Sequence, residues 1–178
     1  NFSSSTYESY FFWTNLQSIY NIKQQGISQI MTKEDFMDVC LKLAKKAYKQ
    51  DEVPVGAIIV KDNKIIAKAF NRKEKKHCAV YHAEIIAIKK ASKKLKTWNL
   101  SGLSIFVTKQ PCLMCYGAIL SSRIDAIYFG AYDKKYGMQV ENYEKLNEKG
   151  FNSKCYVEGG IKEKECSLLL TNFFKDKR

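Results

Sequence analysis

The 178-residue chain lacks long apolar runs, and none approaches the roughly 20 residues that a membrane-spanning helix needs. Proline occurs only twice and no internal repeat is visible, which excludes collagen-like and low-complexity chains. The 46% of apolar residues is enough for a packed core, so disorder of the whole chain is excluded as well. We therefore expect a soluble protein with one globular domain and no membrane partner.

Arginine is also scarce, because 27 of the 30 basic residues are lysines. With 18 acidic residues, the formal net charge is +12 and the pI is near 9.3. This balance favours a polyanionic partner such as a nucleic acid, although a lysine-rich proteome would produce the same balance. Lysine contacts a phosphate as a point charge, so shape rather than bidentate base readout should carry any specificity.

Residues 1–30 differ from the rest of the chain, because they combine many aromatic and small polar residues with a net charge of zero. They lack the basic start and cleavage site of a secretory signal and the arginines of a transit peptide. A helical pattern begins directly after Met31. We therefore predict an extension of unknown role at 1–30, one separate domain at 31–178 and a cytoplasmic location. The alternative for 1–30 is an ordered arm that packs on the domain.

Hydrophobic periodicity after Met31 predicts helices that alternate with strands. The expected helices cover residues 33–50, 82–95, 112–122, 138–148 and 161–175. The expected strands cover residues 55–60, 64–70, 104–108, 126–130 and 155–159. Thr32 and Asp35 match a capping box for the first helix. This order predicts an α/β domain of about five strands with helices on both faces, and a site at the strand ends.

Six cysteines occur, and an even count is compatible with three disulfides. A chain with this much apolar sequence and no secretory signal does not need them. Cys40 and Cys166 lie on the apolar faces of predicted helices, where a small buried side chain is the favoured interpretation. Cys112 and Cys115 differ, because both stand at the start of a predicted helix.

Two short motifs, His82-x-Glu84 and Pro111-Cys112-x-x-Cys115, each stand at the start of a predicted helix. Cysteines three apart in a first helical turn point the same way, so both sulfurs can reach one ion. The helix dipole there favours thiolates, and His82 can supply a third ligand. Two thiolates and one imidazole suit one Zn²⁺ per chain, with a fourth position open for water.

Glu84 lies two positions after His82, about 200° around the helix, so it can face a bound water instead of the ion. A carboxylate there can take a proton from water and pass it to a ring nitrogen and a leaving amine. Together, the two motifs form the signature that is described for zinc-dependent nucleobase deaminases. Taken alone, Cys112 and Cys115 also fit a redox pair, packing or a structural zinc site. A structural site would need a fourth ligand such as His77 or Cys78, and would leave Glu84 unexplained.

From these residues outward, the chain resembles the bacterial TadA-type tRNA adenosine deaminases over roughly residues 34–178. The matching stretches include LAKKAYKQDEVPVGAIIV, HAEIIAI, PCLMC and SRIDAIYFGAYD. The resemblance implies a three-layer α/β/α cytidine-deaminase-like fold with a mixed sheet of about five strands. It also implies conversion of adenosine to inosine at the wobble position of a tRNA anticodon. Zinc on His82, Cys112 and Cys115, with Glu84 as the proton shuttle, and a homodimer that binds the anticodon stem-loop follow from the same resemblance.

The resemblance also implies contacts with the substrate. Asn71 would hold the flipped nucleoside, Val53 would line the base pocket, and the backbone around Ala83 would contact the purine edge. Asp133 would touch the nucleotide backbone, and the helix that carries Phe173 and the next phenylalanine would flank the anticodon loop. Core packing is the alternative for at least one of these two phenylalanines. An adenine amine cannot be reached inside a base stack, so the base must turn out into a pocket.

By the same resemblance, four departures from the family pattern would lie around the pocket and the RNA path. Gln110 stands where a glutamate is usual, residues 79–81 replace an Asp/Pro-Thr-Ala run, Tyr132 replaces an arginine, and residues 137–141 differ. None of them is a predicted metal ligand, so they affect the assignment of the substrate and not that of the metal site. Two alternatives therefore stay open: a deaminase of a free guanine, cytosine or nucleoside, and a non-catalytic zinc-bearing RNA-binding module. The net charge of +12 disfavours the first, and the intact Glu84 disfavours the second.

Overall fold

A computed structural model describes residues 30–138 and 155–177 of the chain. The predicted extension at 1–30 and the predicted helix at 138–148 fall almost wholly outside these ranges, so both stay predictions. The helices are α2 (Lys33–Tyr48), α3 (Ala83–Leu95), α4 (Leu113–Ser121) and α6 (Glu163–Asp176). The strands are β1 (Gly56–Lys61), β2 (Lys64–Phe70), β3 (Ser104–Lys109), β4 (Ala126–Ala131) and β5 (Tyr156–Glu158).

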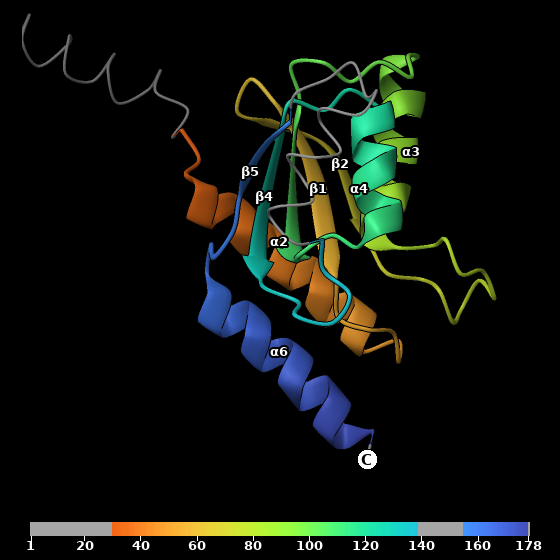
Figure 1. The fold of residues 1–178 in the computed structure, drawn as a ribbon, viewed down its shortest axis with the longest axis vertical. Coiled ribbons are helices and arrows are strands. Elements are labelled where there is room, and N and C mark those ends of the chain that lie inside the picture. Colours follow the sequence, from red (N-terminus) through yellow and green to blue (C-terminus); the bar gives the residue numbers. More distant parts are fainter. Residues whose placement is uncertain (1–29, 139–154, 178) are drawn as a thin grey trace, which may run out of the picture. The chain divides into compact units, whose positions relative to one another are not determined.

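These strands form one mixed sheet in the order β2-β1-β3-β4-β5. Strand β1 runs antiparallel to β2 and β3, whereas β3, β4 and β5 run parallel to one another. Helices α2 and α6 cover one face of the sheet, and α3 and α4 cover the other (Figure 1). The prediction of a three-layer α/β/α fold with a mixed sheet of about five strands is therefore confirmed.

Helix α2 begins at the predicted capping box. The Thr32 hydroxyl accepts a hydrogen bond from the Asp35 N–H, and the Asp35 carboxylate accepts one from the Thr32 N–H. The buried side chains of α2 then recur at helical spacing and face the sheet. A Cβ atom on Gly56 would lie 2.1 Å from the Cys40 carbonyl oxygen, so the glycine lets α2 approach β1 closely.

The opposite face of the sheet packs against α3 and α4. Ala83, Ala87 and Ala91 are fully buried at four-residue spacing, which brings α3 close to β1 and β2. Strands β3 and β4 end, and α3 and α4 begin, at one end of the domain (Figure 1). This arrangement places both predicted motifs at the end of the sheet where β3 and β4 finish.

The cysteines are free thiols, and Cys40 and Cys166 are buried as the sequence predicted. Within residues 30–138 and 155–177, no helix has both the length and the apolar character to cross a membrane.

Candidate metal centre

Three side chains that can bind a metal meet where α3 and α4 begin; they are called the ligand cluster below. His82 is the N-cap residue of α3, Cys112 is the N-cap residue of α4, and Cys115 lies in the first turn of α4. Their ligand atoms all lie within 4.8 Å of one another. His82 Nδ1 is 3.8 Å from Cys112 Sγ and 3.4 Å from Cys115 Sγ. Nitrogen and sulfur ligands of one tetrahedral Zn²⁺ would be about 3.6 Å apart, so these residues fit that ion.

Hydrogen bonds within the ligand cluster shift the pKa values of its side chains. A hydrogen bond from the Cys115 thiol, supported by one from His82, lowers the pKa of Cys112 to about 4. The same bond between the two cysteines raises the pKa of Cys115. The hydrogen bond to Cys112 raises the pKa of His82. A zinc ion would take the place of these protons, because its ligands are thiolates and neutral imidazoles.

Glu84 is the second residue of α3 and is only 5% exposed. Burial raises the pKa of its carboxyl group. A carboxyl group whose pKa is moved toward neutral pH can both accept and release a proton during one reaction. Glu84 is not part of the ligand cluster, and neither are His77 and Cys78. The described residues therefore provide no fourth protein ligand of the kind that a structural zinc site needs.

A cavity of about 210 Å³ opens beside the ligand cluster and is called the site cavity. Val53 and Asn71 line it together with His82, Glu84 and Cys112. Two of the predicted substrate contacts are thus brought to the wall of one cavity with the cluster, and their roles stay predictions.

Asn71 also connects the cavity wall to α3. Its Oδ1 accepts a hydrogen bond of 2.8 Å from the N–H of Ala83. The first turn of α3, which carries Glu84, is therefore joined to the end of β2. The predicted contact of the Ala83 backbone with a purine would use groups other than this paired N–H.

Asp133 does not line the site cavity, although it lies close to residues that do. Its carboxylate forms an ion pair with Lys109 and accepts hydrogen bonds from the N–H groups of Lys135 and Tyr136. Lys109 and Tyr136 both line the cavity. Asp133 therefore organises the cavity edge, and its predicted contact with a nucleotide backbone stays untested.

Phe173 does not reach the cavity either. It is 6% exposed and packs edge-on against Tyr48 and Phe174, as the core-packing alternative predicted. Phe174 is 50% exposed and lines the cavity. Successive residues on a helix point about 100° apart, so only one of two adjacent phenylalanines faces the site.

The chain is similar to known deaminases. A family model described as "MafB19-like deaminase" matches residues 31–178. The chain is 40% identical over 149 residues to the tRNA-specific adenosine deaminase of Bacillus subtilis, covering 83% of this chain and 92% of that protein. It is 45% identical over 148 residues to the protein of the same name from Aquifex aeolicus, covering 83% and 97% of the two chains. The chain belongs to the tRNA-specific adenosine deaminase family.

Solved deaminase structures also superpose on the chain. A structure from a study of A-to-I editing by tRNA:A34 deaminases superposes with a TM-score of 0.71 at 36% identity, covering 76% of this chain and 98% of that one. Guanine deaminase from Bacillus subtilis superposes with a TM-score of 0.55 at 31% identity, covering 69% and 73%. The family resemblance that the sequence predicted is therefore confirmed.

Gln110 replaces the usual glutamate of the family with a side chain that both donates and accepts. Its Nε2 donates to the Met138 carbonyl oxygen (2.6 Å), and its Oε1 accepts from the Asp133 N–H (2.9 Å). A Cβ atom on Gly137 would lie 2.5 Å from Gln110 Oε1, so the segment 133–138 is packed tightly on this amide. An ionised glutamate could not donate to the Met138 carbonyl. The departures at 110 and at 137–138 are thus in contact.

The sequence pattern did not single out Glu52, which lines the site cavity and is 1% exposed. The available signal was an acidic residue directly before the apolar segment 53–55. The same pattern is typical of a surface turn, where a carboxylate is solvated. Only the contacts of the folded chain distinguish the two cases.

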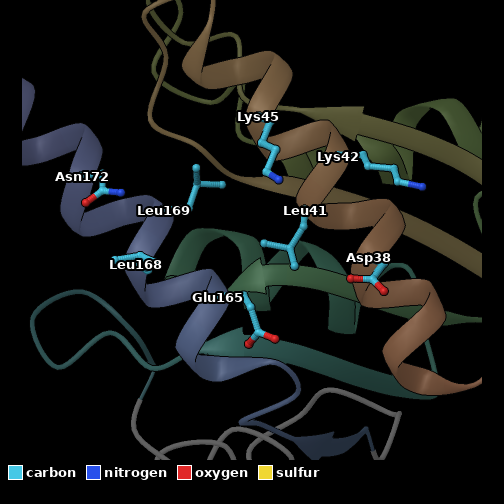
Figure 2. Close-up of a pocket in the computed structure, with 8 residues that line it drawn as sticks. All are labelled: Asp38, Leu41, Lys42, Lys45, Glu165, Leu168, Leu169 and Asn172. Atoms are coloured by element: carbon cyan, nitrogen blue, oxygen red, sulfur yellow. The ribbon is translucent and has the colours of Figure 1, made fainter.

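A second and larger hollow of about 420 Å³ lies between α2 and α6 and is called the α2–α6 groove (Figure 2). Leu41 and Leu169 lie in the groove, and charged side chains such as Asp38, Lys42 and Glu165 surround them. Among the described residues that line it, none is a cysteine or a histidine. Within these residues the groove therefore has no set of side chains like the ligand cluster.

Proposed function

We propose that this chain hydrolyses adenosine to inosine at the wobble position of a tRNA anticodon, with release of ammonia. The observation that carries the proposal is a buried glutamate beside a His/Cys/Cys cluster at one cavity. The support for the substrate is the identity of 40–45% to relatives that are named tRNA-specific adenosine deaminases.

We infer one Zn²⁺ per chain, held by His82, Cys112 and Cys115. When bound, this ion supplies an activated water as the nucleophile at neutral pH. The ligand atoms are close enough for a single ion, and the low pKa of Cys112 provides one thiolate before any metal binds.

Glu84 would move the protons of the reaction. It accepts one proton from the attacking water and delivers it to a ring nitrogen of adenine. It then transfers the second proton of the same water to the leaving amine. Water and adenosine thereby become inosine and ammonia. Burial suits Glu84 to this role, because it raises the pKa of the carboxyl group and so favours uptake of the proton from water.

The site cavity would receive the adenine base after it turns out of the stack. Val53 and Asn71 form part of its wall, and Lys73 and Lys109 place cationic groups at the same cavity. Phe174 offers an exposed ring on which a neighbouring base can stack. We also propose a homodimer, binding of the anticodon stem-loop and a cytoplasmic location.

Product analysis tests this function. The chain is incubated with an anticodon stem-loop that carries adenosine at the wobble position and, separately, with free guanine, cytosine and adenosine. We expect inosine in the RNA at that position only. Ammonia from guanine alone would contradict the proposal and favour the free-base alternative, to which the guanine deaminase likeness corresponds. RNA binding without any product would favour the non-catalytic module.

A further inference from the structure

Glu52 is a buried carboxylate that the proposed reaction does not use. It lies between α2 and β1, directly before Val53, and is 1% exposed. Its Oε1 accepts a hydrogen bond of 2.8 Å from the Lys75 N–H, and its Oε2 accepts one of 3.2 Å from the Glu74 N–H. Burial of a charge is costly unless its oxygens are paired, and here both oxygens accept main-chain hydrogen bonds.

The two donors belong to the segment 72–81, which connects β2 with α3 and is called the connecting loop. Its ends are joined, because the Arg72 N–H donates to the Tyr81 carbonyl oxygen at 3.1 Å. The neighbouring bond from the Ala83 N–H to Asn71 closes the loop directly before the first turn of α3. The base of the loop is thus anchored beside the ligand cluster, and its outer part needs a separate support.

Glu52 provides that support. The outer part is a helix-like turn in which the Lys76 N–H donates to the Arg72 carbonyl oxygen at 3.0 Å. The N–H groups of Glu74 and Lys75 stand at the start of this turn and donate to Glu52. A carboxylate that accepts the first N–H groups of a turn acts as an N-cap residue does in a helix. Glu52 therefore joins the cavity wall at 52–53 to the outer part of the connecting loop.

The supported segment is strongly basic. Four of the five residues at 72–76 are lysine or arginine, and residues 73–76 are exposed. Lys73 lines the site cavity together with Glu84. The backbone that Glu52 holds thus carries a group of positive charges beside the place where the base would enter.

We propose that Glu52 is a positioning residue for RNA binding: it fixes the main chain of 72–76 so that these basic side chains contact the phosphates next to the flipped adenosine. The identity of the ligand rests on the proposed function. Phosphate contacts position a nucleic acid, and each one contributes to the salt dependence of binding. The loss of Glu52 should therefore weaken RNA binding and also make it less dependent on salt.

The experiment compares Glu52→Gln with Glu34→Gln, which removes an equal charge from an exposed position in the first turn of α2. Both variants are made in a Glu84→Gln background, so that binding is measured without turnover. The Kd of a fluorescent anticodon stem-loop is measured by anisotropy at several salt concentrations. For Glu52→Gln we expect a Kd raised about tenfold and a slope of log Kd against log salt that is shallower by about one. Glu34→Gln should change neither.

Amide hydrogen exchange and zinc content show whether the effect is local. We expect faster exchange in the connecting loop of Glu52→Gln, with protection elsewhere and metal content unchanged. An unchanged Kd and slope despite faster loop exchange would overturn the inference.

A second variant covers the case in which Glu52→Gln does not fold. Replacing Lys75 and Lys76 by glutamine removes side-chain charge and leaves the backbone contacts with Glu52 in place. It should reproduce the weaker binding and the shallower slope with normal loop exchange, and normal RNA binding by this variant would overturn the inference.

The result is separable from the proposed function. Wild-type protein that binds RNA with the expected Glu52 effect but forms no inosine contradicts only the proposed function. Inosine formation by the wild type, with binding unchanged in Glu52→Gln, contradicts only the inference.

Discussion

Helices contribute to both the α2–α6 groove and the site cavity, but with different parts: their sides line the groove, and their first turns line the site cavity. The groove, at about 420 Å³, lies along the sides of two helices, where leucines and exposed charges alternate. The site cavity, at about 210 Å³, lies where two helices begin and two strands end. Helix starts offer unpaired N–H groups and a positive dipole end, which stabilise thiolates and carboxylates. The smaller hollow therefore offers the groups that suit the proposed reaction, and volume alone is a poor guide to function.

Metal removal should give the largest contrast between the two regions. We expect a chelator to abolish deamination while the helical circular dichroism signal persists, because two apolar cores hold the sheet on both faces. Added Zn²⁺ should restore activity. A groove variant such as Leu41→Ala should respond to the chelator in the same way as the wild type. Global unfolding on chelation would show that the metal is structural.

Zinc affinity should also depend on pH. The pKa of Cys115 is raised, so zinc must displace its proton at neutral pH. A fall in pH favours the protonated, metal-free form and therefore weakens binding, by about tenfold per pH unit for each proton released. Competition with a zinc chelator of known affinity between pH 6 and pH 8 measures this slope. An affinity independent of pH would contradict the protonated state of Cys115.

Glu84→Gln should lower the rate constant for inosine formation by roughly 10³-fold, because the proton carrier is lost. Zinc content should stay near one ion per chain, since Glu84 is not in the ligand cluster. Glu165→Gln makes the same change at the α2–α6 groove and should keep normal activity. Equal losses in both variants would remove the distinction between the two hollows.

Gln110→Glu should have an intermediate effect. The carboxylate cannot donate to the Met138 carbonyl oxygen, which leaves a buried acceptor beside a negative charge. We expect the free energy of unfolding to fall by about 1–3 kcal/mol and the KM for RNA to rise as segment 133–138 loosens. Urea denaturation and steady-state kinetics measure the two effects. A variant with unchanged KM would show that this segment does not position the RNA.

Leu41→Ala should affect the groove side alone. Leu41 is 8% exposed, and its truncation should lower the free energy of unfolding by about 2 kcal/mol, the low end for a buried leucine because the groove is already open. Activity at saturating RNA should stay within about twofold of the wild type, an expectation that follows from additivity of distant sites. A specific loss of activity at unchanged stability would indicate that the groove is coupled to the site.

Much of the fold could be predicted because its signals are local. The expected helices and strands within the described residues match the observed ones to within two residues at each end, and the Thr32–Asp35 capping box is present. The cysteine pair of the ligand cluster could be predicted equally well, because its spacing in a first helical turn is a local property of the chain. His82 was assigned from the motif that it shares with Glu84, not from a local contact with the cysteines.

Other features could not be predicted, because they depend on contacts between distant segments. Phe173 and Phe174 have the same chemistry, and only the packing against Tyr48 decides which one is buried. Gln110 and Met138 are 28 residues apart, and their hydrogen bond exists only after β3 and β4 pair. The family resemblance could mark Gln110 and residues 137–141 as departures from the usual pattern. It could not show which atoms these residues contact.

The amino-acid sequence by itself determined the order of the elements, the family and the residues of the ligand cluster. Periodicity, capping and motif spacing act over a few residues, so they can be read without a folded structure. The tertiary structure decided which groups surround the cluster and which ones hold its loops. Glu52 illustrates the difference, because its carboxylate finds the N–H groups of Glu74 and Lys75 only when β1 and β2 bring them together. Burial and long-range hydrogen bonding are properties of the packed chain. Because of them, an acidic residue whose sequence context is typical of a surface turn supports the connecting loop beside the site cavity.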